Sequence, residues 1–205
     1  MSKVKFISVL TESHGRMKDV VFKTRNGRST MYQYEKHTQD LTANQEKVRK
    51  AFVKLVDDWK QLSPLVRKSW DGHGENPNAS GYNIFIGDNS PRQMAAEPLR
   101  LSRKLGEERL ADFKATPGGA AGQISCGFAP VNGDRHLAFF VQEKANGVAT
   151  GSLERHDGGA NCASPFIVTG LNPGMEYFVY ALVTDKAYHE AMLVSESVGM
   201  LTTAG

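Results

Sequence analysis

Apolar and polar residues follow two different periods along the chain, and the period changes near residue 113. In residues 41–62 the apolar side chains recur at helical spacing and share one face; they are Leu41, Val48, Phe52, Leu55, Trp59 and Leu62. After residue 113, short apolar runs alternate with Gly, Pro, Asn and Asp turns about every 10–15 residues, as in β-sandwiches. The pattern predicts an α+β protein with two domains: residues 1–108, a β-hairpin with a helical hairpin, and residues 109–205, an all-β sandwich.

The first part of the N-terminal half is predicted to be β-structure. Residues 3–10 are short, apolar and β-prone, which indicates a strand. In residues 20–34, Asn26-Gly27 stands between two β-prone runs. This dipeptide favours a two-residue hairpin turn because both residues tolerate positive φ. Three cations surround the expected tip: Lys23, Arg25 and Arg28.

Capping residues predict where the helices begin. Thr42 and Gln45 have capping-box spacing in front of the first helix. Ser63 suits the N-cap of a second helix and Pro64 its first position, where a missing N–H costs nothing. The second helix is expected to pack back onto the first as a helical hairpin through Leu65, Val66 and Trp70.

The chain between this helical hairpin and the sandwich is harder to assign. Residues 71–81 are predicted to be a loop, followed by a short apolar element that buries Tyr82, Phe85 and Ile86 and ends at Gly87 or Asn89. Four leucines within residues 92–112 permit a helix, which Pro98 interrupts. Residues 115–122 are either a linker or the loop after a first β-strand.

Composition adds a charge asymmetry to this picture. Residues 1–105 carry 19 Lys and Arg against 11 Asp and Glu, a net charge of +8, whereas residues 106–205 carry 6 against 11, a net charge of −5. The difference suggests two modules with different neighbours, or copies that attract one another head to tail.

No apolar run is long enough to span a membrane, no signal peptide is expected, and the two cysteines predict reduced thiols in the cytosol.

The sandwich segment contains the spacing of a tyrosine corner, in Leu171, Pro173, Gly174 and Tyr177. On these residues it resembles a fibronectin type III or related immunoglobulin-like domain. The resemblance implies that the tyrosine hydroxyl bonds to the backbone near the corner. The tryptophan common on the third strand of such domains is absent, and Phe139 or Phe140 stands in its place.

Strand alternation predicts an aromatic patch on this domain. If Tyr177 points inward, so do Val179, Ala181 and Val183, while Phe178 and Tyr180 point outward beside Phe140 of the neighbouring strand. Exposed aromatic patches usually mark interfaces. The candidate partner interface is therefore Phe140, Phe178 and Tyr180, together with Lys23, Arg25 and Arg28 of the hairpin. The three aromatic residues are covered either by the helical half of the same chain or by another subunit.

A wider resemblance covers the helical half. The chain is similar to a set of bacterial, prophage and phage proteins, mostly of unknown function, with a basic hairpin, a Leu-Ser-Pro turn before a tryptophan, a Ser-Gly-Tyr-Asn-x-Phe segment and a β-sandwich tail. The matching residues are Gln45, Arg49, Trp59, Leu62, Pro64, Trp70, Gly81, Tyr82, Asn83 and Phe85. The resemblance implies a virion or virion-assembly component, located in the particle and assembled in the host cytoplasm, and brings no catalytic residues.

Residues with catalytic or metal-binding potential form no established motif. The chain lacks a phosphate-binding loop with its lysine, a dinucleotide-binding fingerprint and a His-Glu-x-x-His sequence. Two loose clusters, Asp71 with His73 and Glu75, and Glu154 with His156, Asp157 and Cys162, are interpreted as solvated loops. Cys126 alternates with apolar residues and is predicted to be a small core residue. We expect no enzymatic activity, cofactor or metal.

These observations leave three functional hypotheses. The preferred one is a non-enzymatic structural protein of a phage or prophage particle, head or tail, that contacts other assembly proteins as a homo- or hetero-oligomer. The second is a nucleic-acid-binding accessory protein that uses the basic hairpin and the first helix, because a two-stranded ribbon fits the DNA major groove. The third is a carbohydrate- or surface-binding module, by analogy of fold alone.

Overall fold

The computed structural model describes residues 2–3, 15–25, 28–35, 40–72, 79–106, 110–131, 133–145 and 148–205. The chain divides into two compact units, Met1–Thr42 and Ala43–Gly205, and each is considered by itself. The predicted strand over residues 3–10 lies mostly outside the described residues, as do the Asn26-Gly27 turn, His73 and Glu75.

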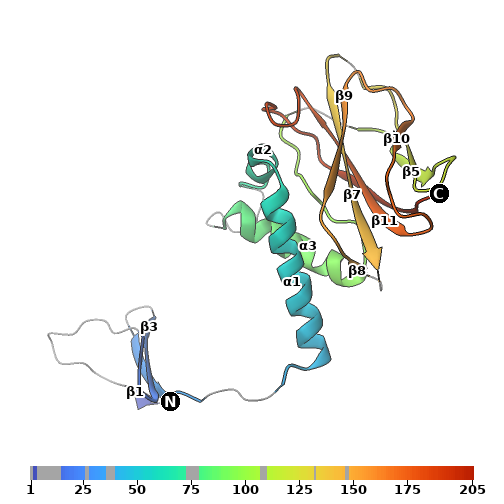
Figure 1. Cartoon of the computed structure of the whole chain (residues 1–205). Helices are drawn as coiled ribbons and strands as arrows, with labels where there is room; N and C mark the ends of the chain where they lie inside the picture. The colour runs from blue at the N-terminus through green and yellow to red at the C-terminus, as the bar shows by residue number, and fades with distance from the viewer. Residues whose placement is uncertain are drawn as a thin grey trace. The chain divides into compact units, whose positions relative to one another are not determined.

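The first unit contains an antiparallel sheet with the strand order β1-β4-β3-β2. Its strands are β1 (Ser2–Lys3), β2 (Gly15–Met17), β3 (Val20–Arg25) and β4 (Arg28–Gln33) (Figure 1). Arg25 pairs directly with Arg28, which confirms the predicted hairpin and its register.

The second unit begins with three helices: α1 (Ala43–Gln61), α2 (Pro64–Lys68) and α3 (Gly81–Ala95). The predictions of the first helix and of the Ser63-Pro64 start are confirmed, and the Val66 backbone N–H donates to Ser63 Oγ at 3.3 Å. The second helix is only five residues long, so the main helical neighbour of α1 is α3.

The prediction that α3 ends at Gly87 or Asn89 was wrong. The helix continues past Pro91 because the Asn89 side chain is satisfied by tertiary bonds rather than by ending the helix. Asn89 Nδ2 donates to the Arg100 carbonyl at 2.9 Å, and Asn89 Oδ1 accepts from the Arg100 N–H at 2.7 Å. Of the helix permitted over residues 92–112, only residues 92–95 are helical among the described residues, as the end of α3. Residues 97–104 run without helix, with Leu99 and Leu101 buried.

Two facing antiparallel sheets form the rest of the second unit. One has the order β10-β6-β5, and the other contains β12-β11-β7-β8 with β9 also paired to β7. The strands are β5 (Lys114–Pro117), β6 (Ile124–Gly127), β7 (His136–Ala145), β8 (Val148–Ala149), β9 (Glu154–Ala160), β10 (Phe166–Val168), β11 (Glu176–Thr184) and β12 (Val198–Thr203). Because β5 precedes Gly118, residues 118–122 form the loop after a first strand rather than a linker.

The core between these sheets confirms the predicted alternation. The inward set Leu137, Phe139 and Val141 on β7 and Tyr177, Val179, Ala181 and Val183 on β11 packs in one cluster with residues of β6 and β10. The tyrosine corner is also present. The Asn172 backbone N–H donates to Tyr177 Oη at 3.0 Å, and Gly174 adopts a φ of 73° in the turn between them.

A second core covers the opposite face of the larger sheet. Phe140, Phe178, Tyr180 and Leu182 pack in one cluster with Leu55, Leu62, Val66, Trp70 and Phe85 of the helical segment. The helices and the sandwich therefore share a core, and the predicted boundary at residues 108/109 does not separate compact units. The division falls between Thr42 and Ala43 instead.

Candidate interaction surfaces

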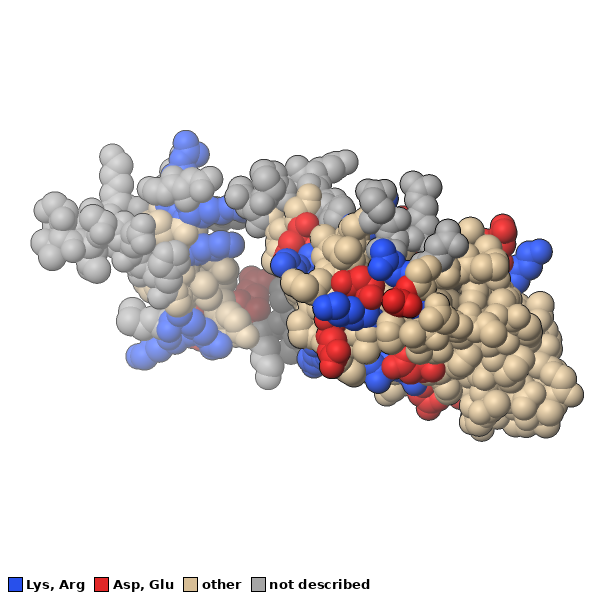
Figure 2. All heavy atoms as spheres, turned by 90° about the horizontal axis from the view of Figure 1, so that it is seen from above, with Lys and Arg blue, Asp and Glu red and all other residues tan. Residues whose placement is uncertain are grey.

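The three cations predicted at the hairpin tip lie on one face of the first unit. Lys23 pairs with Thr30, Arg25 with Arg28, and Val21 with both Arg16 and Tyr32. Because paired residues share a face and alternate residues along a strand return to it, this face carries Arg16, Lys23, Arg25, Arg28 and Tyr32. We call these five residues the basic face. In Figure 2 the Lys and Arg atoms of this unit stand out at the left of the view.

Exposure follows the same alternation. Lys23 and Arg25 are exposed, whereas Phe22 and Thr24, which alternate with them, are half-buried. Arg16 extends over the ring of Tyr34, with the guanidinium carbon 3.7 Å from the ring centroid. None of the four cations of the basic face forms an ion pair with a residue that the structure describes.

The three aromatic residues proposed as a partner interface are buried. Phe140 is 3% exposed, Phe178 1% and Tyr180 0%. Of the two alternatives for what covers them, the structure places the helical segment of the same chain over them. The fold-defining residues of that segment, Trp59, Trp70, Tyr82 and Phe85, form an aromatic chain: Trp59 contacts the rings of Tyr82 and Phe85, and Phe85 meets Trp70 edge-on.

A buried polar chain crosses the junction between helices and sheet. Asp58 of α1 is fully buried, forms an ion pair with Lys54, and accepts a 2.9 Å hydrogen bond from Gln142 Nε2. Tyr180 Oη donates to Gln142 Oε1 at 3.5 Å and accepts from the Leu99 backbone N–H at 3.3 Å. Burial raises the pKa of Asp58, while Lys54 and Gln142 act in the opposite direction. These bonds orient α1 on the sheet.

The raised pKa of Asp58 predicts a pH effect on stability. The folded protein binds this proton more tightly than the unfolded chain, so the ionised carboxylate lowers the free energy of unfolding above its folded-state pKa. That cost disappears as the pH falls below the unfolded value of about 4. We therefore expect the Asp58→Asn variant to gain stability relative to the natural protein as the pH rises from about 4 to 7.

Urea unfolding of both proteins across this pH range measures the difference. The control is Asp112→Asn, which removes an exposed carboxylate elsewhere in the second unit. A constant difference between Asp58→Asn and the natural protein over the whole range would contradict the prediction.

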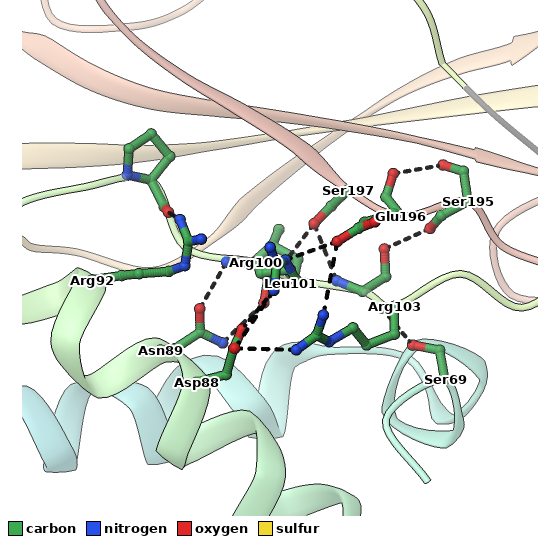
Figure 3. A network of polar contacts seen from close by, with 12 residues as sticks. Ser69, Asp88, Asn89, Arg92, Arg100, Leu101, Arg103, Ser195, Glu196 and Ser197 are labelled. Carbon is green, nitrogen blue, oxygen red and sulfur yellow. Dashed lines mark hydrogen bonds and ion pairs between the residues drawn. The ribbon is translucent and has the colours of Figure 1, made fainter. Parts of the chain in front are cut away.

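A second polar network fastens the segment after α3 to the sandwich (Figure 3). Asp88 on α3 and Glu196 before β12 lie on either side of Arg100 and Arg103. Arg100 lies 2.8 Å from Glu196 and 3.2 Å from Asp88, and Arg103 lies 3.1 Å from Asp88. Ser197 Oγ accepts the Leu101 N–H at 2.8 Å, and Ser102 Oγ donates to the Ser195 carbonyl at 2.8 Å. Arg103 Nε is buried without a hydrogen-bond partner among the described residues. The other groups pair within the chain, and their bonds join α3, the segment after it and the residues before β12.

One flank of α1 leaves apolar side chains exposed. The sequence predicted one stripe through Val48, Phe52 and Leu55, but the buried face is centred on Ala51, Leu55 and Asp58. Residues three positions apart differ by about 60° around a helix. Phe52 therefore lies beside this face rather than at its centre and is 47% exposed. Val48 is 49% exposed in the first part of the helix, where every residue from 43 to 50 is exposed.

A surface loop presents a second exposed apolar pair. Met192 is 71% exposed and Leu193 37%. Asp185 Oδ1 accepts the backbone N–H groups of Met192 and Leu193 at 2.8 and 2.9 Å. Burial acts to raise the pKa of Asp185, but these hydrogen bonds together hold it below its usual value. The Asp185 carboxylate thus fixes the backbone of the loop, while the side chains of Met192 and Leu193 face solvent. Sequence periodicity gave no sign of this pair, because the loop has no regular repeat.

A groove of about 610 Å³ lies beside the other flank of α1. Ala51, Met94 and Ala149 contribute apolar surface, and Lys47, Lys50 and Lys54 also line it. Lys50 pairs with Glu46 at 2.7 Å, and Lys54 pairs with Asp58. Two of its three cations are thus neutralised within the chain.

Of the two candidate metal clusters, only the one at Glu154, His156, Asp157 and Cys162 lies wholly within the described residues. Among the described residues, which include Glu154, His156, Asp157 and Cys162, no three His, Cys, Asp or Glu side chains gather as ligands. Cys126 is a buried core residue, as predicted, and burial raises the pKa of its thiol to about 12. No helix in the described part of the chain is long and apolar enough to cross a membrane.

Comparisons with known proteins found similarity to part of the chain. No family model matches the sequence, and no curated protein matches it. Among solved structures, the crystal structure of the FN5 domain of Drosophila Lar is similar to part of the chain. The match covers 47% of this chain and 96% of that domain, with 23% identity and a TM-score of 0.33. At this level of similarity the comparison assigns no function. The chain itself combines helices with antiparallel sheets, as the sequence predicted.

Proposed function

We propose that this protein is a non-enzymatic structural component of a phage or prophage particle and that it works through contacts between copies of itself. Its sandwich is assigned to the fibronectin type III and immunoglobulin-like class, on the strength of the tyrosine corner and the strand order of the two sheets. The sequence resemblance to phage and prophage proteins supports the location in a particle. The observation that carries the proposed contact is the exposed apolar flank of α1.

Two surfaces of the second unit are suited to one another. Val48 and Phe52 lie next to Arg49 on the exposed flank of α1, and Met192 lies next to the exposed Glu190. A cation beside one apolar surface and an acid beside the other complement each other at an interface. The opposite net charges of residues 1–105 and 106–205 favour the same pairing.

The two surfaces differ, so the contact is heterologous: α1 of one copy meets the Met192 loop of the next. Such head-to-tail contacts generate rings or filaments, which are the usual forms of repeated parts in a particle. A homotypic contact between two α1 flanks would give closed dimers instead.

The test measures molar mass by size-exclusion chromatography with light scattering over a range of concentrations. The natural protein is expected to form higher oligomers, and Phe52→Ser and Met192→Ser are each expected to reduce them to monomer. The matched control is Val53→Ser, because Val53 is 52% exposed on another side of the same helix. It should retain the oligomer.

Mixing the two variants tests the direction of the contact. Phe52→Ser keeps an intact Met192 loop and Met192→Ser keeps an intact α1 flank, so a mixture is expected to form 1:1 heterodimers. Failure to form them, with both variants folded, excludes the heterologous contact. Mass spectrometry of purified particles tests the location, and a protein found only free in the cytosol would contradict it.

A further inference from the structure

The basic face of the first unit is a different surface from the proposed contact between copies. We propose that it binds single-stranded nucleic acid, with Arg16, Lys23, Arg25 and Arg28 contacting phosphates and Tyr32 stacking against a base. This inference goes beyond the proposed function and does not depend on it.

The strand register brings like charges together on the basic face, where a bound anion would reduce their repulsion. Arg25 and Arg28 pair directly across the hairpin, and like charges in that position destabilise an antiparallel pair. Lys23 lies two residues from Arg25 on the same face. The acidic residues described in this unit, Asp19, Glu35 and Asp40, lie in a turn and after β4 rather than on strands. Among the residues that the structure describes, the fold therefore gathers positive charge on this face without placing an acidic side chain on it.

The aromatic residue distinguishes nucleic acid from an acidic protein as the ligand. Tyr32 is 43% exposed on the same face and opposite Val21, and its ring offers a flat surface among the cations. The Tyr34 ring already holds the Arg16 guanidinium at 3.7 Å, which shows that planar groups stack at this end of the sheet. Cations along the backbone and an exposed aromatic ring for a base are the usual combination for single strands.

The width of the sheet favours a single strand over a duplex. Four strands at about 4.8 Å separation span about 14 Å before side chains are added, whereas the DNA major groove is about 12 Å wide. The whole face therefore lies against a nucleic acid rather than inside a groove. Stacking on Tyr32 also requires a base that is unpaired. From Tyr32 to Arg28 the face runs four residues, or about 13 Å.

Fluorescence anisotropy with the full-length chain tests the proposal, using a labelled 20-nucleotide oligothymidine and a 20-base-pair duplex as probes. With three or four phosphate contacts, the plot of log affinity against log salt for the single strand is expected to have a slope of about −2 to −3. Arg25→Ala/Arg28→Ala should weaken binding at least tenfold and make this slope shallower by about 1.4.

Two controls distinguish a loss of binding at the basic face from the effect of lower total charge and from the effect of misfolding. Lys68→Ala/Lys114→Ala removes the same charge from exposed positions of the second unit and should bind as the natural protein does. Tyr32→Phe should retain affinity, whereas Tyr32→Leu, which keeps an apolar contact with Val21, should lose it severalfold. Circular dichroism checks the fold of every variant.

Four results would overturn the proposal: no binding of the single strand, a flat salt dependence, tighter binding of the duplex, or equal losses in the two double variants. Equal affinity of Tyr32→Phe and Tyr32→Leu would remove the stacking role and with it the preference for nucleic acid over an acidic protein. None of these outcomes changes the mass measurement that tests the contact between copies, so the two proposals fail separately.

Discussion

A chain shortened to residues 41–205 is expected to fold and remain soluble, whereas a chain shortened to residues 109–205 is expected to aggregate. The first truncation keeps the whole second unit together with Thr42 in front of α1. The second keeps both sheets but removes the helices that cover one of them. Phe140, Phe178, Tyr180 and Leu182 then face water as one apolar patch.

The size of the effect follows from how much apolar surface is uncovered. Each large side chain contributes about 1.5–3 kcal/mol when it is fully buried, and four of them lose their cover together. The shorter fragment also loses the bonds that the segment after α3 makes with Ser195 and Ser197. A patch of contiguous aromatic and aliphatic side chains is an aggregation site.

Expression in the soluble fraction, light scattering and heteronuclear NMR spectra of the two fragments provide the measurement. The control introduces threonine at Phe140, Phe178 and Leu182 in the 109–205 fragment, which should restore part of its solubility if exposure of this face is the cause. A soluble, well-dispersed 109–205 fragment without these changes would show that the sandwich is an independent domain and that the shared core is dispensable.

Trp70→Ala is expected to lower the free energy of unfolding of the second unit by about 3–5 kcal/mol. The Trp70 side chain is fully buried, meets Phe85 edge-on at 5.3 Å between ring centroids, and donates its Nε1–H to the Leu101 carbonyl at 3.0 Å. Alanine leaves a cavity between α2, α3 and the sheet, and it leaves that buried carbonyl without its donor. The melting temperature should fall on the order of 10 °C.

The comparison is with Phe52→Ala, an aromatic residue that the sequence also placed on the core side of its helix. Because Phe52 is 47% exposed, the same kind of truncation should cost less than about 1 kcal/mol. Thermal and urea unfolding at low protein concentration measure both variants without the proposed contact between copies. Equal losses in the two variants would mean that α1 is turned differently from the structure described here.

Local patterns identified the elements whose geometry is determined within a few residues. Three such elements are the β3–β4 hairpin, the Ser63 cap and the tyrosine corner at Tyr177. Each depends on short-range backbone requirements that particular residue types meet. Strand alternation likewise separated the Val179 face of β11 from the Tyr180 face, because side chains on a strand must alternate.

The same patterns could not show what each face packs against. Asn89 looked like a helix end because its side chain commonly bonds its own backbone, but in the folded chain it bonds Arg100 and the helix continues. Nothing in the periodicity of α1 marks Asp58 as buried, yet in the folded chain its carboxylate pairs with Lys54 and accepts from Gln142. Both outcomes depend on a residue outside the helix, Arg100 for Asn89 and Gln142 for Asp58.

By itself, then, the sequence determined the first helix, the start of the second, the β-rich second half, the hairpin register, the tyrosine corner and which strand positions share a face. Those properties follow from backbone geometry and from side-chain period. Only the tertiary structure decided that the helices cover Phe140, Phe178 and Tyr180, that the units divide at residue 42 rather than 108, and that Phe52 faces solvent. An apolar stripe favours burial but does not specify which helix or strand covers it. Contacts between residues of different elements decide that, and they exist only in the folded chain.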